Sequence, residues 1–408
     1  MSEMSFLEKL LDGVNVEWRP LSEALNRTKG TKITAAQMRE LHKEGAPIKI
    51  FAGGKTYAFF DFSDIPKKDI NEEPSIIVKS RGFIEFEYYD KPFSHKNEMW
   101  SYNANGKQLD IKFVYYFLKV HEPYFQNIGS KMQMPQISIP DTDNFRIPIP
   151  CPENPKKSLE IQAEIVRILD AMTAHTAELT AELTAELTAR KKQYNYYRDK
   201  LLSFEDDVNE LPLSDICTSI ADGDHQAPPQ TNKGISFVTI SNISDNGFID
   251  FLKTKYVPND YYNNLASKRK PQVGDVLYTV VGSIGIPVFI DFEKEFTFQR
   301  HIAILRFKPE LVNPKYAFHF MRSSKFFNKA NSVAMGAAQK TITLGTLGKL
   351  KISLPSLDRQ NKVVAILDKF DSLANSITEG LPREIELRQK QYAYYRDLLL
   401  SFPAAQAA

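Results

Sequence analysis

One long phrase occurs twice in this chain, and this repeat constrains the fold more than any other feature. Residues 162–170 read QAEIVRILD and residues 360–368 read QNKVVAILD. Residues 190–204 (RKKQYNYYRDKLLSF) and 388–402 (RQKQYAYYRDLLLSF) form a second pair. Both pairs are separated by 198 positions without a gap. Apolar residues at helical spacing in a segment of constant length predict two helices of equal length on one rigid frame.

The duplication extends to the flanks of two variable stretches. EWRPLSEAL at 17–25 resembles NELPLSDIC at 209–217, and IPIP at 147–150 resembles ISLP at 352–355. An entry strand, a variable domain, an exit strand and a long helix therefore follow one another twice. We predict an α+β protein in which two mixed α/β domains, related by a pseudo-twofold axis, are separated by two long antiparallel coiled helices. The predicted segments are an N-terminal helical arm at 1–14, a first variable domain at 15–150, a central helix at 151–206, a second variable domain at 207–355 and a C-terminal helix at 356–408.

The first helix carries an internal repeat of its own. No Gly or Pro occurs between Pro155 and Pro212, and TAEL is repeated three times at 176–187. One such repeat turns an α-helix by about 400° and lengthens it by about 6 Å. The second helix contains Gly380 and Pro382, so we predict a kink or short break there.

Composition places the chain among ordinary globular proteins. Its 408 residues allow two or three domains, and its net charge is only +2. Two cysteines exclude a disulfide framework. No apolar run approaches 18 residues, and the first residues lack the apolar stretch of a signal peptide. We therefore expect a cytoplasmic protein without a membrane partner.

The motifs of common active sites are missing. GGKT at 53–56 lacks the first Gly of a P-loop because Lys49 stands there, so a turn between strands is the simpler interpretation. Asp141 and Asp143 are not followed by the Glu-x-Lys of a nuclease, which favours turn chemistry. The seven histidines have no metal-binding spacing. We predict no catalytic residue, no metal site and no cofactor in this chain.

Polar loops are the remaining candidates for function. Both variable domains begin with the duplicated PLS, which leads into a polar loop at 26–35 in the first and at 221–234 in the second. Lys, Arg, Asn and Gln in such loops can reach phosphates and base edges of double-stranded DNA. For each single residue, the alternative to a DNA contact is that the side chain is ordinary solvent-exposed surface. The candidates are Lys29, Thr31, Lys32, Lys79, Arg81, His95, Lys96, Asn97, Lys131 and Gln133 in the first variable domain, and His225, Gln226, Asn232, Lys233, Ser283, Gln299, Arg300, Gln339, Lys340 and Thr341 in the second.

The duplicated YxYYRD motif has two interpretations. Tyr side chains three residues apart lie on one helix face and can pack against a domain. Identity of the two copies instead favours docking of one partner protein on each half of the chain. Both interpretations stay open for Tyr194, Tyr197, Arg198, Tyr392, Tyr395 and Arg396.

Several of these segments resemble the specificity subunit of type I restriction–modification enzymes. They are DGDHQAPP at 222–229, GDVLYTVVGSIG at 274–285, the stretch 339–368, the two long helices and the TAEL array. The resemblance covers essentially the whole chain, and the TAEL array is similar to the spacer of the type IC group. The first domain departs from the pattern because it lacks a clear GDH-type loop.

The resemblance implies a non-catalytic reader of DNA. Each variable domain would be a target recognition domain for one half of an asymmetric, bipartite site, and the helices would set the spacing. The helices would also carry two methyltransferase subunits, which bind S-adenosylmethionine and methylate adenine, and restriction subunits that use ATP and Mg²⁺. A coiled-coil scaffold that does not bind DNA is the alternative, and the small net charge favours it.

Overall fold

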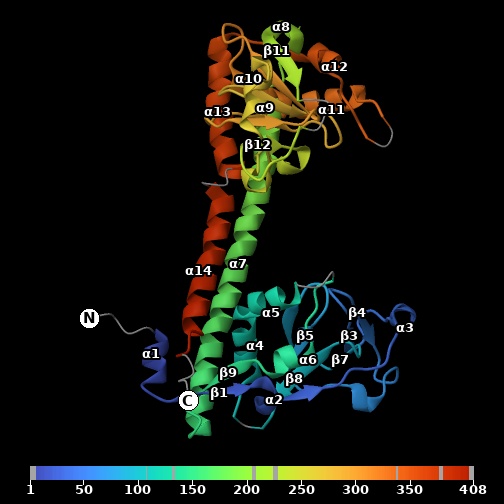
Figure 1. The fold of residues 1–408 in the computed structure, drawn as a ribbon, viewed down its shortest axis with the longest axis vertical. Helices are drawn as coiled ribbons and strands as arrows, with labels where there is room; N and C mark the ends of the chain where they lie inside the picture. Colours follow the sequence, from blue (N-terminus) through green and yellow to red (C-terminus); the bar gives the residue numbers. More distant parts are fainter. Residues whose placement is uncertain are drawn as a thin grey trace. The chain divides into compact units, whose positions relative to one another are not determined.

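The computed structural model divides into two compact units, each of which is described by itself (Figure 1). Unit 1 comprises residues 1–180 and 387–408, and unit 2 comprises residues 181–386. Each unit thus combines one variable domain with parts of both helical segments. The boundary in the first helix falls inside the TAEL array. The structure describes residues 6–106, 108–130, 134–204, 208–223, 228–336, 339–375 and 380–403.

Unit 1 contains two sheets beside its helices. The larger sheet has the strand order β2-β8-β5-β6, and the smaller has the order β4-β3-β7 with β3 parallel to β7. β1 and β9 pair antiparallel, as expected for entry and exit strands. The elements are α1 (Phe6–Leu11), β1 (Val16–Pro20), α2 (Leu21–Ala24), β2 (Leu25–Thr28), α3 (Ala35–Glu40), β3 (Ile48–Phe51), β4 (Tyr57–Phe60), β5 (Ser75–Lys79), β6 (Glu85–Tyr89), β7 (Phe93–His95), β8 (Trp100–Ala104), α4 (Ile111–Val120), α5 (Glu122–Gly129), α6 (Ile139–Asp143), β9 (Arg146–Pro150) and the first part of α7 (Pro155–Leu201).

Unit 2 repeats this topology. Its larger sheet has the order β11-β17-β14-β15, its smaller sheet has the order β13-β12-β16 with β12 parallel to β16, and β10 pairs with β18. The prediction of one mixed α/β fold carried twice is therefore confirmed. The elements are β10 (Glu210–Pro212), α8 (Leu213–Ile216), β11 (Cys217–Asp222), β12 (Ile235–Val238), β13 (Lys255–Val257), α9 (Asn259–Asn263), β14 (Val276–Thr279), β15 (Pro287–Phe289), β16 (Phe296–Phe298), β17 (Ile302–Phe307), α10 (Pro314–Met321), α11 (Ser324–Val333), α12 (Leu344–Lys349), β18 (Lys351–Ser353), α13 (Leu357–Asn375) and α14 (Gly380–Leu399).

The long helical segments differ in continuity. α7 is a single helix of 47 residues, as its lack of Gly and Pro predicts. The second segment is divided into α13 and α14, and Gly380 has a φ of +75°, which an α-helix does not contain. The prediction of a break is therefore confirmed. α7 ends at Leu201 and α14 at Leu399, which are equivalent positions in the repeat.

Each unit pairs two of these helical stretches. In unit 1 the Tyr392 hydroxyl is 2.8 Å from Thr173 Oγ1. In unit 2 the ring of Tyr197 stacks on Phe370, and Arg359 lies 4.7 Å from the centroid of Phe204. The contact of Tyr197 with Phe370 and that of Phe204, just after α7, with Arg359 run in opposite directions along the chain, so the pair in unit 2 is antiparallel.

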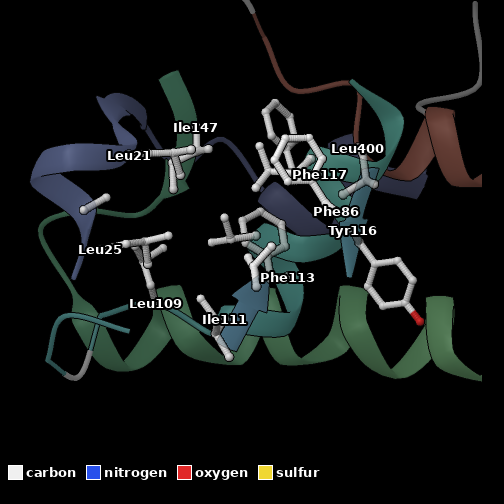
Figure 2. Packing of buried hydrophobic residues seen from close by; sticks show 14 of the residues in the cluster. Leu21, Leu25, Phe86, Leu109, Ile111, Phe113, Tyr116, Phe117, Ile147 and Leu400 are labelled. Atoms are coloured by element: carbon white, nitrogen blue, oxygen red, sulfur yellow. The ribbon is translucent and has the colours of Figure 1, made fainter. Parts of the chain in front are cut away.

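The end of α14 belongs to the core of unit 1. Leu399, Leu400 and Phe402 are buried in one cluster with residues of α2, α4, β5 and α7. Figure 2 shows Leu400 beside Phe117, and it shows the Tyr116 hydroxyl pointing toward α7. Leu202 is buried in the corresponding core of unit 2. The duplicated LLSF therefore closes one hydrophobic core in each unit.

The duplicated glutamine fixes each domain on its helix. Gln162 Oε1 accepts a hydrogen bond of 2.8 Å from the Asp110 amide, and its Nε2 donates to Gln108 O at 3.1 Å. Gln360 makes the same bonds to the Asn313 amide and to Leu311 O, at 2.8 and 3.1 Å. Both side chains are fully buried. Each glutamine therefore satisfies backbone groups at the start of α4 or α10 that have no partner inside their own helix.

The duplicated aspartate follows the glutamine by eight residues on the same helix and makes a second contact with the domain. Asp170 forms an ion pair of 2.7 Å with Lys112 and accepts a hydrogen bond from the Tyr116 hydroxyl at 2.6 Å. Asp368 pairs with Lys315 at 2.9 Å and contacts His319 Nε2 at 2.8 Å. Burial opposes ionisation of Asp368, but the bonds from His319 and Lys315 outweigh it and hold the pKa of this carboxyl below its usual value.

We predict that Gln162→Ala destabilises unit 1 and that Gln360→Ala destabilises unit 2, each by about 2–4 kcal/mol, because every buried backbone group left without a partner costs about 1–3 kcal/mol. Chemical unfolding followed by hydrogen exchange of the two units measures the effect. Glu160→Ala and Lys362→Ala, at exposed positions of the same helices, are the matched controls. A loss no larger than that of the controls would contradict the anchoring role.

Candidate nucleic-acid interface

Three strands of the larger sheet end together in each domain. In the second domain Asp222 is opposite Ala303, and Thr279 is opposite Ile302, so the end of β11, the start of β17 and the end of β14 meet. In the first domain Thr28 is opposite Ser101, and Val78 is opposite Trp100, so β2, β8 and β5 meet in the same way. The loops that continue from these strands therefore emerge side by side.

Two pairs of loops build this end of each domain. The amide of Lys96 donates to Phe51 O and that of Met99 to Lys96 O, which closes a turn at 96–99. The amides of Gln299 and Ile302 make the equivalent bonds to Val238 O and Gln299 O. We define the loop edge of the first domain as residues 29–32, 80–83, 96–99 and 134–137, and that of the second as residues 222–223, 280–283, 299–302 and 339–342.

A second bridge completes each loop edge. Arg81 is bridged to Gln136, and the Gly82 amide donates to Pro135 O at 2.9 Å. In the second domain Val281 is bridged to Thr341, and the Gly282 amide donates to Lys340 O at 2.9 Å. The two loop edges thus share one backbone and differ in their side chains.

One glycine in each loop edge is required by close packing. A Cβ atom at Gly30 would lie 2.2 Å from His95 O, and one at Gly223 would lie 2.0 Å from Phe298 O. No side chain fits at such distances. Gly30 and Gly223 therefore occupy equivalent places in the two polar loops that follow the duplicated PLS.

The structure brings most candidates of the first domain to its loop edge. Lys29, Lys32, Arg81 and Asn97 are exposed there. Lys96 is half-buried and forms an ion pair of 2.7 Å with Glu98. Burial raises the pKa of the Glu98 carboxyl, but the bond from Lys96 outweighs it and lowers that pKa overall. The exposed cations Lys29, Lys32 and Arg81 can face a polyanion, and the charge of Arg81 also helps to lower the pKa of Glu98.

Three candidates of the first domain are corrected. His95 is fully buried beside Ser101 Oγ at 3.2 Å, and burial lowers the pKa of its imidazole, so this side chain belongs to the domain interior. Thr31 is buried as well. Lys79 Nζ is 2.6 Å from Glu87 and 3.3 Å from Glu85, so its charge is already neutralised within the sheet. None of the three offers a free surface to a ligand.

The second domain gathers six of its candidates. Ser283, Arg300, Gln339 and Lys340 are exposed, whereas Gln299 and Thr341 are half-buried. Lys340 Nζ is 2.7 Å from Asn331 Oδ1, and Gln299 Nε2 is 3.2 Å from His301 Nδ1. Asn232 and Lys233 are exposed but precede β12, whereas the loop edge lies at the other end of that strand. Four candidates lie outside the described residues: Lys131, Gln133, His225 and Gln226.

The tyrosine motifs divide into buried and exposed positions. Tyr194 is 2% exposed, and its hydroxyl is 3.2 Å from His319 Nδ1. Arg198 is also buried and is paired with Asp199 at 3.0 Å. Packing therefore accounts for these two residues of unit 2. Tyr197, Tyr395, Tyr392 and Arg396 retain exposed or half-exposed surface.

The sequence reasoning missed several exposed apolar side chains. Tyr196 and Tyr394, which belong to the YxYYRD motif but were not among the predicted docking residues, are 60% and 64% exposed. At the loop edge of the first domain Phe83 and Met134 are 61% and 63% exposed. Their positions next to Gly82 and Pro135 could have suggested turns, but not that they lie together.

Other kinds of site find no support in the part of the chain that the structure describes. No group of three His, Cys, Asp or Glu side chains there could hold a metal ion. GGKT forms the turn between β3 and β4, as expected. Within the described residues, no helix has the length and apolar character needed to span a membrane.

Comparison with known proteins decides the family. The family model described as "Type I restriction modification DNA specificity domain" matches residues 20–189 and 205–387. The chain belongs to the type I restriction–modification specificity subunits. The two matches each take in one variable domain and most of the helical segment that follows, so the family model itself recognises the duplication.

Relatives and solved structures agree with this family. The EcoR124I/EcoR124II specificity subunit of Escherichia coli is 38% identical and aligned over 99% of this chain and 98% of its own. A putative specificity subunit of Haemophilus influenzae is 32% identical over 98% of both chains. A chain from a structure titled for complex assembly and conformational transition of the type I R-M system shares the fold with a TM-score of 0.60, at 14% identity, over 94% of this specificity subunit and 97% of that chain.

Proposed function

We propose that this specificity subunit is the non-catalytic DNA reader of a type I restriction–modification complex, and that each variable domain reads one half of an asymmetric, bipartite site. The observation that carries the proposal is the loop edge. The same backbone occurs in both domains with different side chains, which is what two different half-sites require. The matching family model and the relatives support the same role.

The side chains of the two loop edges suit DNA. Lys29, Lys32 and Arg81 in the first domain, and Arg300 and Lys340 in the second, can neutralise phosphates or donate to guanine O6 and N7. Asn97 and Gln339 carry amides of the kind that bond to adenine N6 and N7. Phosphate contacts would position each domain, and contacts to base edges would provide specificity.

The helices would set the distance between the half-sites. α7 runs without interruption from unit 1 to unit 2, and the boundary between the units falls in the TAEL array. One TAEL repeat contributes a net rotation of about 40°, close to the twist of about 34–36° per base pair of DNA. We propose on this ground that the array acts as a spacer, as in the type IC group.

The exposed tyrosines would receive the partner proteins. Tyr196 and Tyr394 occupy equivalent positions of the repeat and face solvent in both units. Aromatic residues are enriched at the centres of protein interfaces. We propose that two methyltransferase subunits dock here, one on each copy, and that Tyr197 and Tyr395 border the contact.

The chemistry of the complex would lie in those partners. Methyltransferase subunits would bind S-adenosylmethionine and methylate adenine, and restriction subunits would use ATP and Mg²⁺. The specificity subunit itself would need no cofactor, and a DNA reader of this kind would work in the cytoplasm. The alternative of a scaffold that does not contact DNA loses support from the cationic side chains at both loop edges.

The first prediction separates the two half-sites. Arg81→Ala should weaken binding through the first half-site, and Arg300→Ala through the second, each by about tenfold, since a good contact from Arg to a base contributes about 1–3 kcal/mol. Methylation mapping in cells that carry the complete system identifies the site. Competition binding with duplexes in which one half-site is scrambled then measures the contribution of the other half-site to the affinity.

The matched controls for this prediction are Lys91→Ala and Lys294→Ala. Both lysines are exposed just before β7 and β16, at the ends of these strands away from the loop edge. If either arginine variant weakens both halves equally, or if its lysine control does the same, the assignment of one half-site to each domain is wrong.

A second prediction concerns spacing. Deletion of residues 180–183 removes one TAEL repeat and keeps the helical phase of its neighbours within about 40°. We expect the same half-site sequences with an untouched spacer shorter by one base pair. Methylation mapping of the deletion variant checks this, and an unchanged spacer would show that the helix does not set the distance.

A third prediction concerns partner docking. The double variant Tyr196→Ala and Tyr394→Ala should bind co-expressed methyltransferase subunits at least about tenfold more weakly, because truncation of a central aromatic residue at an interface costs more than about 1 kcal/mol per site. Its melting temperature should be unchanged since both rings are exposed. Tyr124→Ala, an exposed tyrosine of α5, is the control. Full partner binding by the double variant would refute the docking site.

A further inference from the structure

The loop edge of the first domain carries two large apolar side chains in an exposed position. Phe83 is 61% exposed and Met134 is 63% exposed. Side chains of this size are normally placed in a core or at an interface when they lie together, because their exposure to water is unfavourable.

The backbone places these two residues beside one hydrogen bond. Arg81 is bridged antiparallel to Gln136, and the Gly82 amide donates to Pro135 O at 2.9 Å. Phe83 follows Gly82 and Met134 precedes Pro135, so the two exposed side chains flank this hydrogen bond at one point of the loop edge.

The second domain has polar residues at the same two positions. Val281 is bridged to Thr341 and the Gly282 amide donates to Lys340 O, so Ser283 and Gln339 flank the equivalent hydrogen bond. Both are exposed. An apolar pair in one loop edge thus stands where the other has a hydroxyl and an amide, on the same local backbone.

The surroundings of the apolar pair indicate what covers it. Arg81 precedes it by two residues and is exposed, and Lys29, Lys32 and Lys96 belong to the same loop edge. A surface rimmed by cations fits a polyanion better than it fits the apolar face of a protein. Among the base edges in the major groove of DNA, the one large apolar group is the C5 methyl of thymine.

We propose that Phe83 and Met134 bind a thymine C5 methyl group in the first half-site, whereas Ser283 and Gln339 read the second half-site through hydrogen bonds. This inference rests on the proposed function, since it assigns a base contact to a loop edge that reads DNA. It adds that the two domains discriminate by different chemistry.

The test replaces thymine by uracil, which removes the methyl group and leaves the base-pairing edge unchanged. Affinity is measured for the full-length chain in complex with its methyltransferase subunits, on duplexes in which each thymine of the mapped site is replaced in turn. We expect a loss of about fourfold at one or two thymines of the first half-site, the value for one buried methyl group. The double variant Phe83→Ala and Met134→Ala should bind the thymine and uracil duplexes equally.

Two further variants make the result specific. Phe62→Ala removes another exposed Phe of the same domain. This residue follows β4 and lies near the start of β3, away from the loop edge, so the variant should keep the uracil effect. Phe83→Ser combined with Met134→Gln introduces the polar pair of the second domain. It therefore tests the contact with side chains that already occur at the equivalent positions of the other loop edge. It should abolish the effect at the first half-site and leave the second unchanged.

The outcomes separate this inference from the function on which it rests. If the wild-type complex shows no preference for its mapped site, the proposed function fails. If that preference is present but uracil has no effect in the first half-site, the thymine contact is wrong. The contact is also wrong if the uracil effect persists in the double variant.

Discussion

The buried amide of a glutamine holds each variable domain of this specificity subunit on its helix. Gln162 and Gln360 each satisfy an amide at the start of the domain helix and a carbonyl just before it, in a fully buried place. An unpaired backbone group there would cost more than the bond contributes, so the geometry is strongly determined. The aspartate eight residues later fixes the rotation of the domain about that point.

This shared attachment lets the rest of each domain vary. Tyr116 in unit 1 and His319 in unit 2 reach the equivalent aspartates with different side chains, and Tyr194 is buried against His319 whereas Tyr392 bonds to Thr173. The loop edges differ further, in that one presents an apolar pair and the other a polar pair. Constant backbone and variable tips are what a reader of unequal half-sites needs.

Much of the architecture could be predicted from the duplicated phrases. They predict two equal helical segments, paired entry and exit strands and one fold carried twice, because periodicity and the absence of Gly or Pro act locally. The break at Gly380 follows from the same rules. The roles of Gln162 and Asp170 could not be derived, since their partners at 108–116 are distant in sequence and share little with 311–319 beyond the matching Lys112 and Lys315.

The candidate site was predicted in part for a similar reason. Exposed lysines and arginines in polar loops follow from composition, and the structure gathers most of them. His95 and Lys79 were misjudged because burial depends on strands contributed by distant segments, not on the polar neighbours of a residue. That Phe83 and Met134 flank one hydrogen bond depends on a bridge between loops that are far apart along the chain.

The four-residue length of the TAEL repeat has a consequence for how the gene can change. The repeat is four residues, so its coding unit is twelve nucleotides, and loss or gain of one copy by slippage during replication keeps the reading frame. Neither hydrophobic core contains a residue of the array. With the array as the proposed spacer, such an error would give a new target and leave the residues of both hydrophobic cores and both loop edges unchanged.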